Sequence, residues 1–465
     1  MTMKTGFGMG EFTPYGRKIS LLGQMHERIT DNINDGIFVT AMLIESESTR
    51  TLWIATDALG MTAKASYECF LAAKEILPNL KEEEFVTSAT HTHTGVSFEA
   101  YNALTATDTV PADVIGSNEC IKLLANAVKT AVAKAKESLE ESSMEIAVSR
   151  IQTATCRRME YKDGKTIMYG NTAGDDFAKT EGRDGGPMQL VYVYGKERNL
   201  KGVVANLPCT AQCDEQAYYV SSDYWGVVRE NVQKELGSEV TVLPLCRCAG
   251  DLTPHNFIDR FPSKKDDSIS GGRKSAMETG KRIAREIVYC KDETVRKYCG
   301  QVHHAQAMKE ITLPAHTVTK EEYEWAKEFI EKYKADESYI GSKGKYCTGN
   351  RRFNYLNSHA KIRKYENPQA EVKTRIYATV IGDIAFITNP FELFIEYGDR
   401  IRMALPECIV YDVELCYERL GYLPTERAAK GGSYSTFTFN GECPASAGDI
   451  LVKESIDLVK SIAEY

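Results

Sequence analysis

The sequence SATHTHTG occupies residues 88–95 and follows directly on a short apolar run. That run, Glu84–Ser88, is rich in β-branched and aromatic residues and is typical of a buried strand. Side chains two positions apart in an extended backbone project to the same face, so His91 and His93 are expected to point into one space. Two imidazoles at the end of a buried strand are suited to metal binding, and a hydrogen-bonded pair of core histidines is the alternative interpretation.

Apolar runs typical of strands alternate with helical segments along most of the chain, which favours the α/β class with mixed α+β character. The predicted strands are Phe38–Ile44, Leu52–Ala55, Phe85–Ser88, Glu145–Val148, Gln189–Val193, Gly202–Leu207 and Val240–Pro244. The predicted helices are Ala63–Ile76, Glu119–Ser138, Tyr224–Leu236, Gly271–Val288, Lys320–Tyr333, Leu393–Met403 and Gly448–Ala463. A Gly-Asp turn predicts a hairpin between Thr374–Val380 and Ile384–Thr388. We therefore expect mixed β-sheets with flanking helices and a metal site at the strand ends.

Composition narrows the class of protein. The chain has 465 residues, of which 43% are hydrophobic and 26% charged, and its net charge of −8 argues against nucleic-acid binding. No apolar run is long enough for a transmembrane segment. The N-terminus has no apolar signal region and the 13 cysteines are scattered, so we expect a cytoplasmic protein with mostly free thiols. We expect one domain over residues 1–465, with an excursion at 318–368 that is helical first and irregular afterwards; the sequence indicates no oligomeric state.

Six further segments stand in a fixed order around the two histidines. They are GFGMGEFTPYG at residues 6–16, NLPC at 206–209, SDYWG at 222–226, AGDLTP at 249–254, NPFE at 389–392 and GYLPT at 421–425. In this order the segments resemble the catalytic domain of the neutral/alkaline (non-lysosomal) ceramidase family, from Gly6 to Tyr434. The His-x-His motif and the Gly-Asp-x-Thr-Pro step carry most of the resemblance. The C-terminal immunoglobulin-like domain of that family has no room in this chain, so a catalytic domain alone is expected.

The resemblance implies a zinc ion with four ligands, three of which correspond to His91, Glu392 and Tyr422. The fourth is a histidine in the family, and counting back from Asp223 without a gap places Cys209 there. A thiolate is an equally good ligand, with a zinc–sulfur distance of about 2.3 Å. A shift in the alignment would instead place Thr210 or Gln212 at this position. A buried cysteine without any ligand role is the alternative interpretation of Cys209.

The resemblance also implies the groups that face the substrate, which are His93, Tyr434, Arg157 and Thr253. Thr253 stands where the family has a serine and keeps the hydroxyl while adding a methyl group. Zinc with a nitrogen, a sulfur or nitrogen, and a carboxylate ligand keeps a position for water and lowers the pKa of that water from 15.7 to about 7. His93, Tyr434 and Thr253 would then supply protons or hydrogen bonds to the developing oxyanion.

These residues predict a zinc-dependent hydrolase that cleaves the linear amide bond of a small-molecule N-acyl substrate. No segment is typical of a membrane-facing helix, so a substrate smaller or more polar than long-chain ceramide is at least as well supported. A catalytically inactive binding or scaffold protein with the same fold is the first alternative. The second is a metal-independent enzyme in which Cys209 attacks the substrate and forms an acyl-enzyme.

Overall fold

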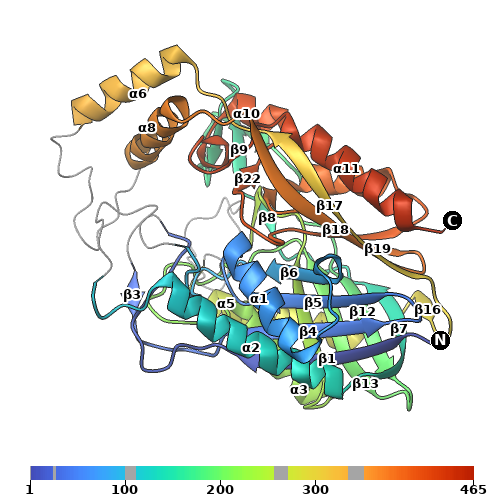
Figure 1. Cartoon of the computed structure of the whole chain (residues 1–465). Helices are drawn as coiled ribbons and strands as arrows, with labels where there is room; N and C mark the ends of the chain where they lie inside the picture. The colour runs from blue at the N-terminus through green and yellow to red at the C-terminus, as the bar shows by residue number, and fades with distance from the viewer. Residues whose placement is uncertain (1, 25–27, 100–110, 256–270, 334–349, 465) are drawn as a thin grey trace.

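The larger of two central β-sheets has nine strands, in the order β14-β13-β12-β7-β1-β4-β5-β6, with β16 paired to β7 (Figure 1). The strands are β1 (Lys4–Glu11), β4 (Phe38–Glu45), β5 (Arg50–Thr56), β6 (Phe85–Ala89), β7 (Glu140–Val148), β12 (Gln189–Gly195), β13 (Leu200–Leu207), β14 (Thr241–Cys246) and β16 (Arg296–Tyr298). The pairs β5–β6 and β13–β14 are parallel and the others antiparallel, which confirms the expected mixed pairing. This computed structural model describes residues 2–24, 28–99, 111–255, 271–333 and 350–464.

The smaller sheet packs face to face on the larger one. Its strands are β17 (His304–Pro314), β18 (Glu371–Ile381), β19 (Ile384–Thr388) and β21 (Ile409–Val413), in that order across the sheet. The predicted hairpin is confirmed as β18–β19, with Gly382 at φ 60° in the turn. Large aromatic side chains fill the space between the sheets, and the rings of Trp53 and Phe386 are 5.5 Å apart.

Helices cover the two outer faces of this double sheet (Figure 1). Those on the larger sheet are α1 (Ala63–Ile76), α2 (Ser117–Glu137), α3 (Tyr224–Leu236) and α5 (Arg273–Cys290), and those on the smaller sheet are α9 (Ile395–Met403) and α11 (Ala447–Ile462). The predicted ends of α1 and α3 match the observed ones. The Thr62 hydroxyl accepts a hydrogen bond from the amide of Ala65, and the Asp223 carboxylate accepts one from the amide of Tyr224. Within the described part of the chain, no helix is both long and apolar enough to cross a membrane.

Short strand pairs extend from the ends of the two sheets. Three are two-stranded: β2 (Ile19–Ser20) with β3 (Ile29–Thr30), β8 (Thr155–Cys156) with β15 (Leu252–Thr253), and β20 (Glu392–Leu393) with β22 (Tyr422–Leu423). A third strand joins the remaining pair, so that β9 (Arg158–Tyr161) lies between β10 (Thr166–Met168) and β11 (Phe177–Thr180). Helix α10 (Glu426–Gly431) follows β22. The β20–β22 pair is parallel and places Glu392 directly opposite Tyr422. Two residues 30 positions apart in sequence therefore become neighbours through backbone pairing alone.

The glycine-rich start of the chain is strand β1, which passes directly beneath α2. Gly6, Gly8 and Gly10 lie on one face of this strand, and a Cβ on Gly8 would lie 2.1 Å from the carbonyl oxygen of Ala131. The same helix meets the other two glycines through Ala127 and Ala135. Alanines four residues apart on α2 and glycines two residues apart on β1 thus allow the helix backbone to touch the strand backbone.

Gly8→Ala is expected to lower the free energy of unfolding by about 3 kcal/mol or more, because the added methyl group meets a backbone oxygen that cannot move aside. Urea unfolding followed by circular dichroism measures this loss. Gly186→Ala is the matched control, because its nearest atom is a flexible guanidinium nitrogen of Arg183 at 3.4 Å. We expect the control to stay within about 0.5 kcal/mol of the wild type. Equal losses in the two variants would contradict the close approach of β1 and α2.

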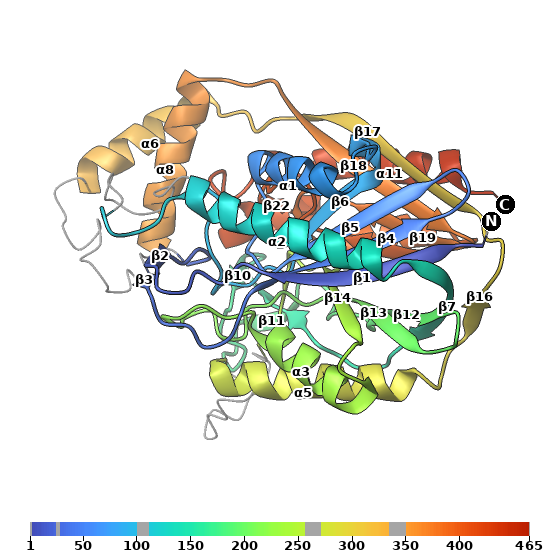
Figure 2. The same ribbon diagram turned by 60° about the horizontal axis from the view of Figure 1, so that its bottom comes forward.

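The segment between β17 and β18 carries two helices, α6 (Lys320–Tyr333) and α8 (Asn350–Glu366), which lie beside each other at one end of the smaller sheet (Figure 2). The helix at 320–333 was predicted, but the expectation of irregular chain after it is wrong, because α8 is helical. Polar and apolar residues alternate along α8 without a clear helical period, so the sequence pattern did not reveal it. Contacts with α6 hold it instead: Tyr323 stacks on Tyr365, and Lys361 pairs with Glu322.

Candidate active site

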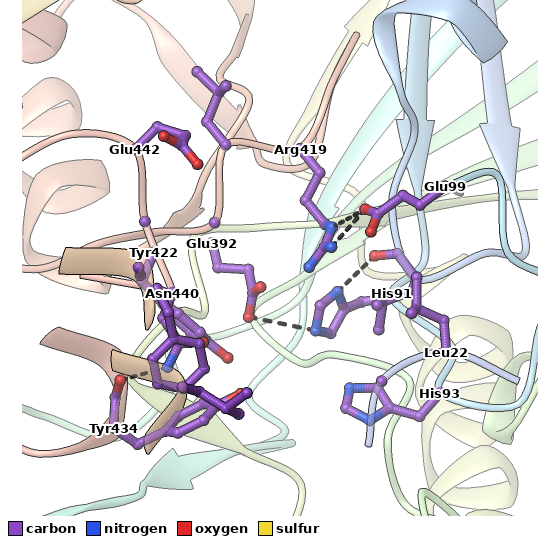
Figure 3. A pocket seen from close by; sticks show the side chains of 18 of the residues that line it. Leu22, His91, His93, Glu99, Glu392, Arg419, Tyr422, Tyr434, Asn440 and Glu442 are labelled. Carbon is purple, nitrogen blue, oxygen red and sulfur yellow. Dashed lines mark hydrogen bonds and ion pairs between the residues drawn. The ribbon is translucent and has the colours of Figure 1, made fainter. Parts of the chain in front are cut away.

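A cavity of about 540 Å³ opens where β6, β20 and β22 end (Figure 3). Five of the eight site residues proposed from the sequence line this cavity: His91, His93, Glu392, Tyr422 and Tyr434. Arg157 lies directly behind the lining, because its guanidinium donates a hydrogen bond to the Tyr422 hydroxyl at 3.0 Å. Thr253 and Cys209 do not line the cavity.

The backbone turns at His91 and does not continue in the extended form assumed from the sequence. His91 has φ 63°, a left-handed conformation that is rare for residues other than glycine. Both histidine rings nevertheless reach the same cavity, with centroids 5.0 Å apart. The expected meeting of His91 and His93 is therefore confirmed, but a turn at the end of β6 produces it.

The His91 ring is oriented by a backbone carbonyl. Its Nδ1 atom is 2.7 Å from the Leu59 oxygen, which requires the proton on Nδ1 and leaves the lone pair of Nε2 free to bind a cation. That Nε2 atom lies 3.5 Å from Oε2 of Glu392, and both side chains are almost completely buried. Burial lowers the pKa of His91, so the ring is neutral at pH 7, as a metal ligand must be.

The separation of His91 and Glu392 fits two ligands of one metal better than a hydrogen bond. Nδ1 of the neutral His91 ring carries the proton that is donated to Leu59, so Nε2 has none to donate to Glu392, and the two lone-pair atoms face each other at 3.5 Å. Two ligand atoms at about 2.1 Å from a tetrahedral zinc ion lie about 3.4 Å apart. The two side chains therefore stand at the spacing that a zinc ion between them would require.

Two tyrosines stand beside this pair. Burial raises the pKa of Tyr422 well above its usual value, whereas the charge of Arg157 acts in the opposite direction. Tyr434 packs edge to face against Tyr422, with ring centroids 5.8 Å apart, and burial raises its pKa as well. Both phenols are thus neutral hydrogen-bond donors unless a cation binds to them.

Two solved structures resemble the chain over its full length. One is the neutral ceramidase from Pseudomonas aeruginosa, with a TM-score of 0.71, 14% sequence identity, and coverage of 100% of this chain and 76% of that chain. The chain has the fold of neutral ceramidase. A ceramidase complexed with C2 matches with a TM-score of 0.69, the same identity and the same coverage of both chains. No protein-family model and no curated protein sequence matches the chain.

Within this ceramidase fold, Cys209 lies in the core under α3. Its thiol contacts the carbonyl oxygens of Thr153 at 3.3 Å and Thr210 at 3.7 Å. Burial raises the pKa of Cys209 to about 12, which disfavours the thiolate that nucleophilic attack needs. Among the described residues, no three histidine, cysteine, aspartate or glutamate side chains are grouped so that they could hold a metal. A cation at this site would depend on Tyr422 or water in addition to His91 and Glu392.

Two other residues named from sequence lie together behind the cavity. The amide nitrogen of the Gln212 side chain is 3.4 Å from the Thr253 hydroxyl, and the same nitrogen is 3.3 Å from the hydroxyl of Tyr169. Thr253 sits on β15 and is completely buried. Thr210, the other alternative to Cys209, has a buried hydroxyl with no hydrogen-bond partner in the described residues.

The sequence did not identify several groups that shape the cavity. Arg419 and Glu99 form an ion pair at its wall, although they are 320 positions apart. Helix α8 contributes a second wall through residues spaced at helical intervals, which are Leu356, His359, Ala360 and Arg363. Phe353 of the same helix packs against Tyr434, with ring centroids 5.1 Å apart. The segment expected as an excursion from the core thus forms one side of the candidate active site.

Proposed function

We propose that this protein is a zinc-dependent hydrolase that cleaves a linear amide bond of a small-molecule N-acyl substrate. The observation that carries the proposal is the pair His91–Glu392, buried at a cavity and separated by 3.5 Å beside Tyr422. The neutral-ceramidase fold supports hydrolysis of the ceramidase type. His91, Glu392 and Tyr422 would hold the zinc ion, and water would take the remaining position, because Cys209, Thr210 and Gln212 do not line the cavity.

Zinc at this site would polarise the substrate carbonyl and make a water molecule acidic enough to attack it. The protein groups around it have complementary properties. His93 is neutral because burial lowers its pKa well below the usual value, so its ring can accept a proton. Tyr434 keeps its proton and can donate a hydrogen bond to the carbonyl oxygen as negative charge develops there. Arg157 holds the hydroxyl of Tyr422 in place.

The cavity lining favours a substrate more polar than long-chain ceramide. Glu99, Arg419, Arg363 and Glu442 contribute to the lining beside four leucines, so charged and apolar groups share walls that a long acyl chain would need to be apolar throughout. Aromatic side chains gather at one side, where Tyr434 packs against Phe353 and Phe439. A short or aromatic acyl group would fit that side, with a polar amine part facing the charged wall.

Elemental analysis of protein purified without chelator tests the proposal. We expect about one zinc ion per chain, together with hydrolysis of short N-acyl amides that stops when a chelator removes the metal. Cys209→Ala is expected to keep the zinc ion, and loss of zinc in this variant would instead assign the Cys209 thiolate as a ligand. A folded wild type that neither contains nor takes up zinc would overturn the proposal. It would instead support a binding protein with the same fold.

A further inference from the structure

The carboxyl group of Glu215, whose side chain is 19% exposed, lies next to His93. Its Oε2 atom is 3.6 Å from Nδ1 of His93, and its Oε1 atom is 3.9 Å from Nε2 of His255. Neither Glu215 nor His255 lines the cavity. The two carboxyl oxygens of Glu215 therefore face different imidazoles, one of His93 and the other of His255.

The position of the His93 ring is fixed by its surroundings. Gly23 packs on the ring so closely that a Cβ there would lie 2.6 Å from Cγ and Nδ1. The amide of His93 donates to the carbonyl oxygen of Ala211 at 3.3 Å, and its own carbonyl oxygen accepts from the buried guanidinium of Arg28 at 2.6 Å. The edge of the ring also meets His91. The packing therefore fixes the place of the ring but not the nitrogen that carries the proton.

Both ring nitrogens of His93 are buried and have no hydrogen-bond partner in the described residues. The carboxyl oxygen of Glu215 faces Nδ1 at a distance slightly longer than a hydrogen bond. Catalytic hydrogen bonds are often this long without substrate and shorten when it binds. Of the two nitrogens, Nδ1 thus has an acceptor within reach, and Nε2 is left for the cavity.

We propose that Glu215 is a positioning residue that accepts the Nδ1 proton of His93 and thereby directs the bare Nε2 atom toward the substrate. The proposal rests on the proposed function in one respect, which is that His93 contacts the substrate. The carbonyl of Leu59 orients His91 in the same manner, so each histidine of the His-x-His motif has its own acceptor at Nδ1. A carboxylate differs from a carbonyl because it also stabilises the imidazolium that forms when Nε2 takes up a proton.

The proton balance of the reaction is simple in this arrangement. Nε2 of His93 accepts one proton from the attacking water as the new carbon–oxygen bond forms. It returns that proton to the departing nitrogen as the carbon–nitrogen bond breaks, so His93 ends neutral. Glu215, in its ionised form, shares the Nδ1 proton throughout, and the products are a carboxylic acid and an amine.

The tautomer of His93 can be measured without any substrate. The chain has eight histidines, so selective labelling of the imidazole nitrogens gives few signals, and His93→Ala identifies the relevant one. Burial raises the pKa of Glu215 to about 7, so the spectrum is recorded at pH 8, where the carboxylate is ionised. We expect the Nδ1–H tautomer for His93 in the wild type and its loss in Glu215→Gln, with His91 unchanged. An Nε2–H tautomer in the wild type would overturn the proposal, even if the protein hydrolyses no amide.

The kinetic counterpart separates positioning from general stability. Glu215→Gln is expected to lower kcat by about 10–100-fold while KM and zinc content stay the same. In a His93→Ala background the same substitution should cause no further loss, because Glu215 acts only through that ring. Asp214→Asn is the matched control, since this neighbouring carboxylate contacts Tyr219 and not His93, and it should leave kcat unchanged. Additive losses, or an equal loss in the control, would contradict the positioning role.

Discussion

Replacing His91 by alanine is expected to abolish zinc binding at the proposed site and to lower the rate of amide hydrolysis by about a thousandfold or more. A catalytic metal supplies several kcal/mol of transition-state stabilisation, and each 1.4 kcal/mol corresponds to a factor of ten in rate. Among the described residues, His91 supplies the imidazole nitrogen that faces Glu392, at 3.5 Å, so its loss leaves Glu392 without a nitrogen ligand beside it. Zinc content and kcat/KM, measured on the same preparation, test this expectation.

Glu392→Gln is expected to give nearly the same loss, because the carboxamide keeps the shape of the side chain but lacks its charge. His303→Gln is the matched control: this histidine bonds to the carbonyl oxygen of Ile462, far from the cavity in sequence and in its contacts. The control should retain both zinc and activity. Retention of zinc and activity in His91→Ala would show that the metal, if bound, lies elsewhere.

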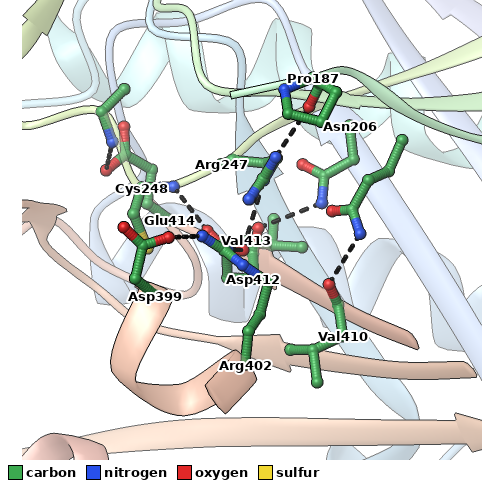
Figure 4. A network of polar contacts seen from close by, with 12 residues as sticks. Pro187, Asn206, Arg247, Cys248, Asp399, Arg402, Val410, Asp412, Val413 and Glu414 are labelled. Atoms are coloured by element: carbon green, nitrogen blue, oxygen red, sulfur yellow. Dashed lines mark hydrogen bonds and ion pairs between the residues drawn. The ribbon is translucent and has the colours of Figure 1, made fainter. Parts of the chain in front are cut away.

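Asp412→Ala is expected to lower the free energy of unfolding by about 3–5 kcal/mol, because it leaves buried cations without their counter-charge. The Asp412 carboxylate lies between Arg247 and Arg402 and also accepts a hydrogen bond from the amide of Cys248 at 3.0 Å (Figure 4). This network joins β21 to the loop that follows β14 and to helix α9, so it fastens the two sheets together. Chemical unfolding followed by tryptophan fluorescence gives the measurement.

The same network has a defined pH dependence. Burial would raise the pKa of Asp412, but the charges of Arg247 and Arg402 outweigh it and hold the pKa well below its usual value. A lowered pKa contributes stability at pH values above about 4, the unfolded value, and that contribution disappears as the pH falls toward the folded value. We therefore expect the stability difference between wild type and Asp412→Ala to shrink in strong acid.

Arg183→Gln provides the control for the network. Arg183 pairs with Asp399 at 2.6 Å, but its side chain is 41% exposed, so water replaces much of the lost interaction. We expect a loss of about 1 kcal/mol or less. A loss as large as that of Asp412→Ala would show that burial does not distinguish the two ion pairs.

Local patterns predicted the helices and the hairpin because their signals lie within a few residues of each element. Apolar spacing located α1 and α3, and a Gly-Asp turn located β18–β19. Strand β1 and helix α8 were different, because each is shaped by a distant partner. The three glycines of β1 are explained by helix α2, whose backbone lies against them.

The sequence by itself predicted that His91 and His93 enter one site, from their separation of two residues at a strand end, although a turn at His91 brings the two rings together. It also placed Glu392 and Tyr422 in the site through a resemblance to an ordered set of motifs. Only the tertiary structure decided that parallel pairing puts these two side by side, that α8 closes one wall, and that Glu215 lies next to His93. Each of these contacts joins segments far apart in the chain, and no local pattern records which distant backbone will pack there.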